Sequence, residues 1–278
     1  MNTKLILIEG IPGSGKTTVA AKLAQYYRER GRQVNLYQEG QLHPADLGWI
    51  ACVPAAQYDG VLKKYPLLRG KIKRNTAFEG DYALIAYTQL KSLGEAFHKE
   101  MEAFEVYDNR VPDETFFGLH YSRWRAFGER AIQSGALNIF ECAFLQNHVN
   151  ELLFWRGADE ETVLAHHLRL IDSVRPLSPV LLYLSQPDMR ETVLRAARER
   201  DGWLDRVVAY CETCPYGKRH GIKGFDGAME LFALRGRVEL SILGQLDIPH
   251  AVIENPSYDW DAVWAQITAY LDGLEQKE

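Results

Sequence analysis

The sequence from Leu5 to Thr17 reads LILIEGIPGSGKT, and the pattern Gly-x-x-x-x-Gly-Lys-Thr runs from Gly10 to Thr17. A short apolar run precedes this pattern, and apolar residues at helical spacing follow it. Glycines at positions 10, 13 and 15 can adopt positive φ angles, which lets backbone N–H groups surround phosphate oxygens. The stretch therefore predicts a phosphate-binding loop between a buried strand and a helix.

The side chains of this loop predict how a nucleoside triphosphate is held. Lys16 is expected to reach the β- and γ-phosphates, and the Thr17 hydroxyl is expected to ligate Mg²⁺. The N-terminus of the helix that begins at Lys16 adds its partial positive charge. ATP is the expected phosphate donor, with GTP left open. The residues expected to bind the nucleotide are Gly10, Gly13, Ser14, Gly15, Lys16, Thr17 and Thr18.

Strands and helices alternate along the chain. The expected strands cover residues 5–9, 33–38, 138–142, 180–185 and 250–254, and the expected helices cover residues 16–30, 148–153, 160–173, 188–200, 229–243 and 259–274. This order predicts an α/β fold in which a parallel five-stranded sheet is flanked by helices. No internal repeat or linker is visible, so one domain over residues 1–278 is expected.

Two segments are expected to decorate this domain. Residues 41–137 form a large insertion with helical patterns at 82–104 and 121–134, and residues 187–227 form a lid region. Most aromatic residues of the insertion are expected to fill a small core of its own. Trp49, Tyr58 and Trp124 are candidates for stacking on an acceptor molecule.

Composition excludes several classes of protein. The chain has 278 residues, 25% of them charged, and a formal net charge of −5. No apolar run approaches the roughly 20 residues that span a bilayer, so a cytoplasmic protein without a membrane partner is expected. The acidic balance disfavours extended nucleic-acid binding. Six basic residues between Val61 and Phe78 are either a solvated face or a patch for an anionic substrate.

The four cysteines are too few and too scattered for a disulfide scaffold in a chain of this length. Cys211 and Cys214 form a lone Cys-x-x-Cys pair. A structural zinc site requires four ligands, and the sequence shows only this half of one. Whether this pair binds a metal ion is left open.

The strand over residues 5–9, the loop ending Gly-Lys-Thr-Thr, and a second strand ending Tyr-Gln-Glu-Gly at residues 37–40 resemble P-loop nucleoside and nucleotide kinases. Deoxynucleoside and thymidylate kinases are the closest pattern. The resemblance spans about residues 3–40, 138–200 and 248–274, and it is specific only at the P-loop. In those kinases an arginine follows the acidic residue that ends the third strand. Here Cys142 follows Glu141, and this departure counts against a nucleoside or nucleotide acceptor.

The resemblance implies roles for four further residues. Glu39 occupies the place of the carboxylate that faces the acceptor hydroxyl, and it is the expected general base; a local turn cap is the alternative. Glu141 is expected to hold Mg²⁺ through a water molecule. Arg195 and Arg198 lie one helical turn apart and are expected to stabilise the transferring phosphoryl group; a solvated face paired with nearby glutamates is the alternative.

The sequence thus predicts an ATP- and Mg²⁺-dependent kinase that transfers the γ-phosphate to a hydroxyl group of a small molecule. A regulatory P-loop NTPase acting on a protein partner is one alternative, although the chain lacks an Asn-Lys-x-Asp motif and a strand ending in a Walker B aspartate. An RNA-directed kinase is another, kept open by the basic run. A homodimer is compatible with the sequence.

Overall fold

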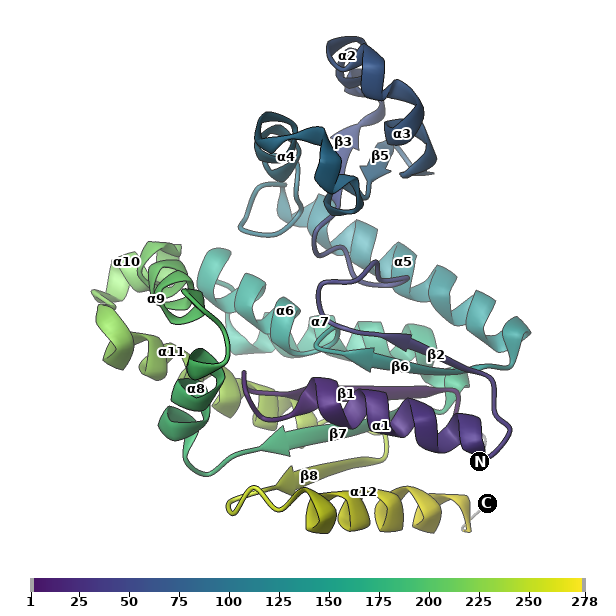
Figure 1. The fold of residues 1–278 in the computed structure, drawn as a ribbon, viewed down its shortest axis with the longest axis vertical. Helices are drawn as coiled ribbons and strands as arrows, with labels where there is room; N and C mark the ends of the chain where they lie inside the picture. Colours follow the sequence, from purple (N-terminus) through teal and green to yellow (C-terminus); the bar gives the residue numbers. More distant parts are fainter. Residues whose placement is uncertain (1–2, 277–278) are drawn as a thin grey trace. The chain divides into compact units, whose positions relative to one another are not determined.

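The computed structural model describes residues 3–276, apart from the side chains of residues 91–93 and 275. The chain forms two compact units, which are described in turn (Figure 1). The first unit comprises Met1–Glu39 and Trp124–Glu278, and the second comprises Gly40–Arg123. Residues 1, 2, 277 and 278 of the expected domain lie outside the described part of the chain.

The first unit is built on a five-stranded sheet in the order β2-β6-β1-β7-β8, in which all neighbours are parallel. The strands are β1 (Leu5–Gly10), β2 (Val34–Tyr37), β6 (Leu137–Glu141), β7 (Val180–Ser185) and β8 (His250–Glu254). The predicted α/β class is confirmed. Because the strands are parallel, their carboxyl ends meet at one edge of the sheet, where Ile8 lies opposite Glu141 and Glu9 opposite Tyr183.

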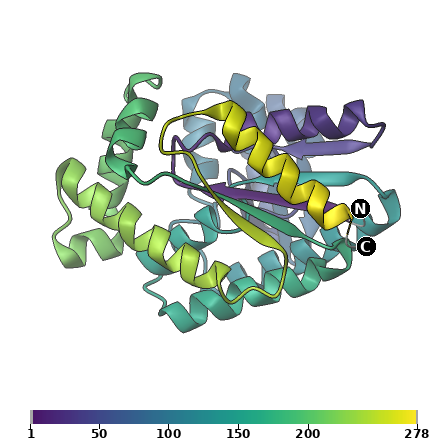
Figure 2. The same cartoon turned by 90° about the horizontal axis from the view of Figure 1, so that it is seen from below.

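Helices cover both faces of this sheet (Figure 2). Ile6 and Ile8 of β1 face the layer formed by α1 and α12, where Leu23 and Ile267 complete the core. On the opposite face, the ring of Trp124 packs against Phe140. The α-helices that lie wholly in this unit are α1 (Lys16–Glu29), α6 (Gln146–Val149), α7 (Glu160–Val174), α8 (Met189–Arg198), α9 (Trp203–Thr213), α10 (Pro215–His220), α11 (Gly224–Leu243) and α12 (Trp260–Glu275). Burial on both faces explains why β1 is apolar at nearly every position.

The second unit contains strands as well as helices. An antiparallel sheet has the order β3-β5-β4, formed by β3 (Ala51–Pro54), β4 (Thr76–Glu79) and β5 (Tyr82–Ile85). The helices α2 (Ala55–Lys64), α3 (Arg69–Arg74) and α4 (Glu95–Glu102) pack around it. The insertion is therefore not purely helical. The expected helix over residues 82–104 is wrong in its first part, because four residues are too few to separate a strand period from a helical one.

Two further boundaries differ from the sequence prediction. Helix α5 (Asp113–Ser134) begins eight residues before the expected start at residue 121, and its residues from Trp124 onward belong to the first unit. The helix expected over residues 229–243 begins earlier, at Gly224 of α11, and α10 occupies most of the Gly-rich stretch before it. Gly217 permits this close packing, since a Cβ atom there would overlap the carbonyl oxygen of Cys211.

Within residues 3–276, none of the helices is both long and apolar enough to span a membrane.

Candidate active site

The loop between β1 and α1 has the conformation that its glycines predict. Gly13 and Gly15 have φ angles of 83° and 90°, in the left-handed region that favours glycine. A Cβ atom at Gly13 would lie 2.7 Å from the carbonyl oxygen of Thr192, and one at Gly15 would overlap the indole ring of Trp260. Both positions therefore require glycine for their φ angle and for the close approach of α8 and α12.

Lys16 is held across the loop. Its side-chain nitrogen Nζ donates to the carbonyl oxygens of Gly10 at 3.0 Å and Ile11 at 2.9 Å. The residue is only 6% exposed. An ammonium group has three donors, so Lys16 can hold both carbonyl groups and still reach a phosphate oxygen.

Thr17, Glu39 and Glu141 lie together beside the loop. The Thr17 hydroxyl donates to Glu141 Oε1, and the backbone N–H of Glu39 donates to Glu141 Oε2 at 3.4 Å. Burial raises the pKa of Glu141, while the Thr17 hydrogen bond and the charge of Lys16 oppose this increase. Hydroxyl and carboxylate oxygens are the ligands that Mg²⁺ prefers, so the donor set fits the expected ion. The roles assigned to these residues stay predictions.

The Glu39 carboxylate contacts two side chains of the segment that follows β6. Gln146 Nε2 donates to Glu39 Oε1 at 2.9 Å, and Cys142 Sγ lies 3.8 Å from Glu39 Oε2. Ligand atoms of Glu39, Glu141 and Cys142 all lie within 4.8 Å of one another. The sequence did not indicate Gln146, since no motif marks an amide in this segment.

Glu9 is a buried carboxylate that the sequence prediction also missed. It is 0% exposed, and its two carboxylate oxygens accept the backbone N–H groups of Phe144 at 2.8 Å and Gln146 at 3.1 Å. Burial raises the pKa of Glu9 to about 7, although these two hydrogen bonds lower it. An acidic residue in an otherwise apolar strand, directly before the glycine loop, was the available signal.

We expect Glu9→Gln to change how stability depends on pH. The pKa of Glu9 in the folded protein, about 7, lies above its ordinary value of 4.5. Between about pH 4.5 and about pH 7 the folded state therefore binds more protons than the unfolded state, so the free energy of unfolding falls as the pH rises. Glutamine does not ionise, so the variant lacks this component.

Urea denaturation of wild type and Glu9→Gln between about pH 4.5 and about pH 7 gives the difference between their free energies of unfolding at each pH. Taking the difference removes the contribution of His167, whose pKa burial lowers to about 4 and which acts in the opposite direction. The variant should gain stability relative to wild type as the pH rises. A difference that stays constant with pH contradicts the prediction.

The two expected lid arginines have different surroundings. The guanidinium of Arg195 lies 3.6 Å from the centre of the Tyr258 ring, and the Tyr258 hydroxyl lies 2.9 Å from Thr192 Oγ1. Arg198 pairs with Glu191 at 3.2 Å, and both side chains are exposed. The contacts of Arg198 match the solvated-face alternative, whereas Arg195 packs on the segment between β8 and α12.

The three aromatic candidates of the insertion differ in how deeply they are buried. Tyr58 is 7% exposed in the core of the second unit, and Trp124 is 0% exposed against Phe140 of the first. Both therefore serve packing. Trp49 is 53% exposed, and its stacking on an acceptor molecule stays a prediction.

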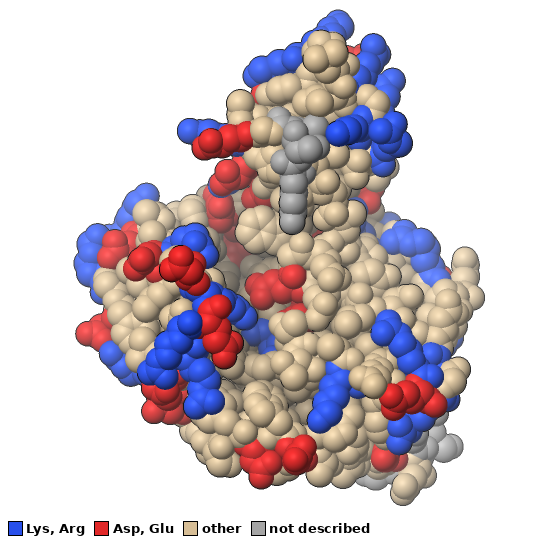
Figure 3. Space-filling view, in the orientation of Figure 1, with Lys and Arg blue, Asp and Glu red and all other residues tan. Residues whose placement is uncertain are grey.

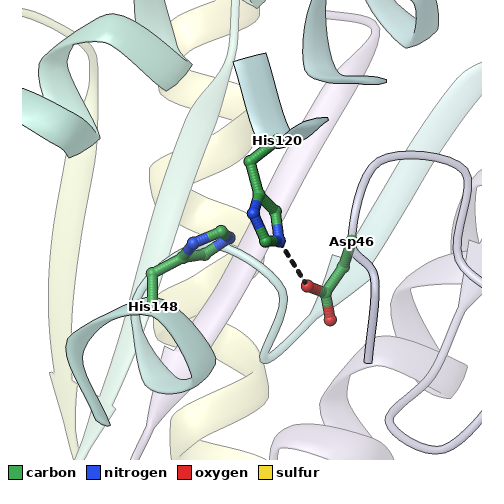
Figure 4. A group of neighbouring side chains, drawn as sticks. All are labelled: Asp46, His120 and His148. Atoms are coloured by element: carbon green, nitrogen blue, oxygen red, sulfur yellow. Dashed lines mark ion pairs between the residues drawn. The ribbon is translucent and has the colours of Figure 1, made fainter. Parts of the chain in front are cut away.

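Buried polar side chains in the second unit form a further group that the sequence did not indicate. His120 Nε2 lies 3.7 Å from Asp46 Oδ1 (Figure 4), and the Tyr107 hydroxyl donates to the same carboxylate. His148, also drawn there, belongs to the first unit, where its Nδ1 lies 3.0 Å from His166 Nε2.

The six basic residues between Val61 and Phe78 are all exposed. Lys and Arg side chains gather over α2 and α3 (Figure 3), and Lys64 pairs with Glu100 at 2.7 Å. The side chains are those of Lys63, Lys64, Arg69, Lys71, Lys73 and Arg74.

The Cys-x-x-Cys pair has a structural role at a helix start. The backbone N–H of Gly217 donates to Cys214 Sγ at 3.2 Å, which caps α10, and Cys214 Sγ lies 3.2 Å from the carbonyl oxygen of Cys211. Burial raises the pKa of both thiols. Among the residues described, neither cysteine belongs to a cluster of three metal-ligating side chains.

Residues 3–64 match the model of a P-loop NTPase family described as chromatin associated protein KTI12. A segment of 119 residues, 40% of this chain, is 34% identical to the signal recognition particle 54 kDa protein of Pyrobaculum calidifontis and covers 26% of it. A segment of 41 residues, 15% of the chain, is 51% identical to the corresponding protein of Pyrobaculum islandicum and covers 10% of it. The chain thus spans about a quarter or less of these curated relatives.

Among solved structures, thymidylate kinase from Candida albicans aligns with 99% of this chain and 94% of its own, at 14% identity and a TM-score of 0.41. Thymidylate kinase from Ehrlichia chaffeensis aligns with 97% of this chain and 98% of its own, at 15% identity and a TM-score of 0.42. The chain thus combines the Gly-x-x-x-x-Gly-Lys-Thr loop at residues 10–17 with a five-stranded parallel sheet.

Proposed function

We propose that the protein is an ATP- and Mg²⁺-dependent phosphotransferase that moves the γ-phosphate to a hydroxyl group of a small molecule. The observation that carries this proposal is the carboxylate of Glu39. It is exposed, and its residue contacts Glu141, which accepts the hydrogen bond of the P-loop residue Thr17. A kinase needs such a carboxylate for its acceptor, in addition to the groups that bind the nucleotide.

The nucleotide would be held by the groups of the loop. Backbone N–H groups and Lys16 bind the phosphates, and the N-terminus of α1 adds its partial charge. Thr17 would hold Mg²⁺ directly and Glu141 through a water molecule. When bound, the ion neutralises charge on the β- and γ-phosphates.

Glu39 would act on the acceptor. Its carboxylate accepts the proton of the acceptor hydroxyl while the hydroxyl oxygen forms a bond to the γ-phosphorus. The bond between that phosphorus and the oxygen bridging to the β-phosphate breaks, and ADP leaves. The proton stays on Glu39 until water removes it. One O–P bond thus forms, one breaks, and the proton of the hydroxyl is accounted for.

We expect Arg195→Ala to lower the turnover number by on the order of 10²-fold while the KM for ATP changes little. An interaction that strengthens as charge develops on the phosphoryl group acts on the transition state rather than on ground-state binding. Arg198→Ala is the matched comparison on the same helix. Its pair with Glu191 is exposed, so its loss should change turnover by less than about 5-fold.

Steady-state kinetics of ADP release, with ATP and acceptor varied separately, measures both variants. If both substitutions change the turnover number by the same small factor, Arg195 does not stabilise the transferring phosphoryl group. An effect of Arg195→Ala on thermal stability alone would do the same.

A screen of candidate acceptors for stimulated ADP release tests the proposed function. Sugars, polyols, nucleosides and hydroxylated amino acids are supplied singly with ATP and Mg²⁺. The proposal expects one class to raise ADP release and to become phosphorylated in equal amount. If no acceptor stimulates ADP release but a protein partner stimulates ATP hydrolysis, the regulatory NTPase replaces this proposal. The match of residues 3–64 to a family described as chromatin associated makes a protein partner the alternative to test.

An RNA-directed kinase is the second alternative, and the exposed basic side chains of α2 and α3 favour it. Binding through these groups would release counterions from the RNA, so its affinity would fall steeply with salt. Binding of transfer RNA at several salt concentrations distinguishes this alternative. A flat salt dependence, or no binding, leaves the small-molecule acceptor.

A further inference from the structure

The side chain of Glu39 is exposed, yet its proposed role as general base requires a fixed orientation. It lies in the turn after β2 and is held neither by a strand nor by a helix. Long exposed side chains lose much rotamer freedom when they are ordered. A general base must nevertheless stay within hydrogen-bond reach of its proton. A residue in this place therefore needs partners that restrict it.

Gln146 is the partner with the best geometry. It is 7% exposed, and its Nε2 donates to Glu39 Oε1 at 2.9 Å. The orientation of the amide is defined, because the reversed amide would place its carbonyl oxygen against a carboxylate. The other neighbour, Cys142, offers only a weak S–H donor at 3.8 Å, and burial raises the pKa of its thiol.

Gln146 is itself anchored from β1. Its backbone N–H and that of Phe144 donate to the two carboxylate oxygens of Glu9, which is 0% exposed. Glu9 directly precedes Gly10, the first residue of the phosphate-binding loop. A continuous set of hydrogen bonds thus connects this loop to Glu39 through Gln146.

The backbone of the intervening segment is strained. Cys142 has a φ angle of 64°, which is uncommon for a residue with a side chain. Such conformations persist where the surrounding structure determines them, often at functional sites. The two backbone hydrogen bonds to Glu9 fix the chain just beyond Cys142, and they therefore hold Cys142 in this conformation.

We propose that Gln146 is a positioning residue that orients the Glu39 carboxylate toward the acceptor hydroxyl, and that Glu9 holds Gln146 in register with the phosphate-binding loop. This rests on the proposed function, in which Glu39 is the general base. Gln146 acts through Glu39 and not on the reacting atoms. It sets the position of the base relative to the phosphates that Lys16 and Thr17 bind.

Gln146→Met tests the proposal, because methionine keeps the length and volume of the side chain and removes its donor. Misplacement of a reacting group by about 1 Å costs up to about 10²-fold in rate, so acceptor-dependent turnover should fall by about 10- to 10²-fold. The KM for ATP should stay the same, since the described hydrogen bond of the Gln146 side chain is with Glu39 and the substitution leaves the backbone contact with Glu9 in place. Gln146→Ala shares the lost donor but packs less well, and it should lose the same factor in turnover.

Asn138→Leu is the matched control. Asn138 is a 2% exposed amide near the opposite end of β6, where its Nδ2 donates to the carbonyl oxygens of Lys4 and Ala136. Both Gln146 variants and this control should be less stable to heat than wild type. Only the Gln146 variants should lose turnover. Turnover that follows thermal stability across the three variants would overturn the proposal.

A double-mutant cycle with Glu39→Gln separates this proposal from the proposed function. If Gln146 acts through Glu39, Gln146→Met should cost much less in the Glu39→Gln background than in wild type. A full additional loss in that background contradicts the positioning role. If Glu39→Gln alone leaves acceptor-dependent turnover unchanged, the assignment of the base fails instead.

Discussion

Lys16→Ala is expected to reduce ATP-dependent phosphoryl transfer by on the order of 10³-fold or more and to weaken ATP binding. The side chain is 6% exposed and its Nζ is held by the carbonyl oxygens of Gly10 and Ile11. A positive charge fixed at this place stabilises the negative charge on the β- and γ-phosphates in the bound state and in the transition state. Alanine removes that charge and leaves the backbone of the loop intact.

Lys22→Ala is the control for this substitution. Lys22 lies on the same helix, is exposed, and its Nζ lies 4.8 Å from the ring centre of Trp264. Its loss should leave ATP affinity and transfer unchanged. Isothermal titration with ATP and an assay of acceptor phosphorylation compare the two variants. Unchanged turnover in Lys16→Ala would refute the entire kinase proposal.

The sequence predicts the core of the fold because its signals are local. The strand β1 is buried on both faces and is therefore a nearly continuous apolar run, and the loop after it combines glycines with Lys16 and Thr17. Glu39 and Glu141 follow or end parallel strands, whose carboxyl ends meet at one edge of the sheet. Their proximity could therefore be predicted without coordinates.

The residues that the sequence did not reveal owe their roles to distant contacts. Glu9 contacts residues 144 and 146, more than 130 positions away, and nothing near Gln146 in sequence marks its contact with Glu39. The sheet of the second unit was missed because each of its strands has four residues and finds its partners only in the folded chain. For Cys211 and Cys214 the sequence left metal binding open, and the capping of α10 by Cys214 depends on a local conformation that the Cys-x-x-Cys spacing does not reveal.

Glu39→Gln is the second substitution with a large expected effect, and it separates a kinase from a plain NTPase. Glutamine keeps the shape of the side chain and removes its negative charge, so it accepts a proton poorly. General-base help is typically worth about 10²- to 10⁴-fold, and acceptor-dependent transfer should fall by about that factor. ATP affinity should barely change, because the described contacts of Glu39 are with Glu141, Cys142 and Gln146 and not with the nucleotide loop.

Background hydrolysis of ATP supplies the internal control for Glu39→Gln. Water can attack the γ-phosphate without the acceptor, so hydrolysis in the absence of acceptor should fall much less than transfer does. The measurement pairs ATP affinity with ADP release, recorded with and without acceptor, in wild type and variant. If binding and turnover fall together, Glu39 is structural, and Glu141 becomes the next candidate because it lies in the same group of carboxylates beside Thr17. If transfer alone falls, the carboxylate of Glu39 acts on the acceptor, since no other step of the reaction requires it.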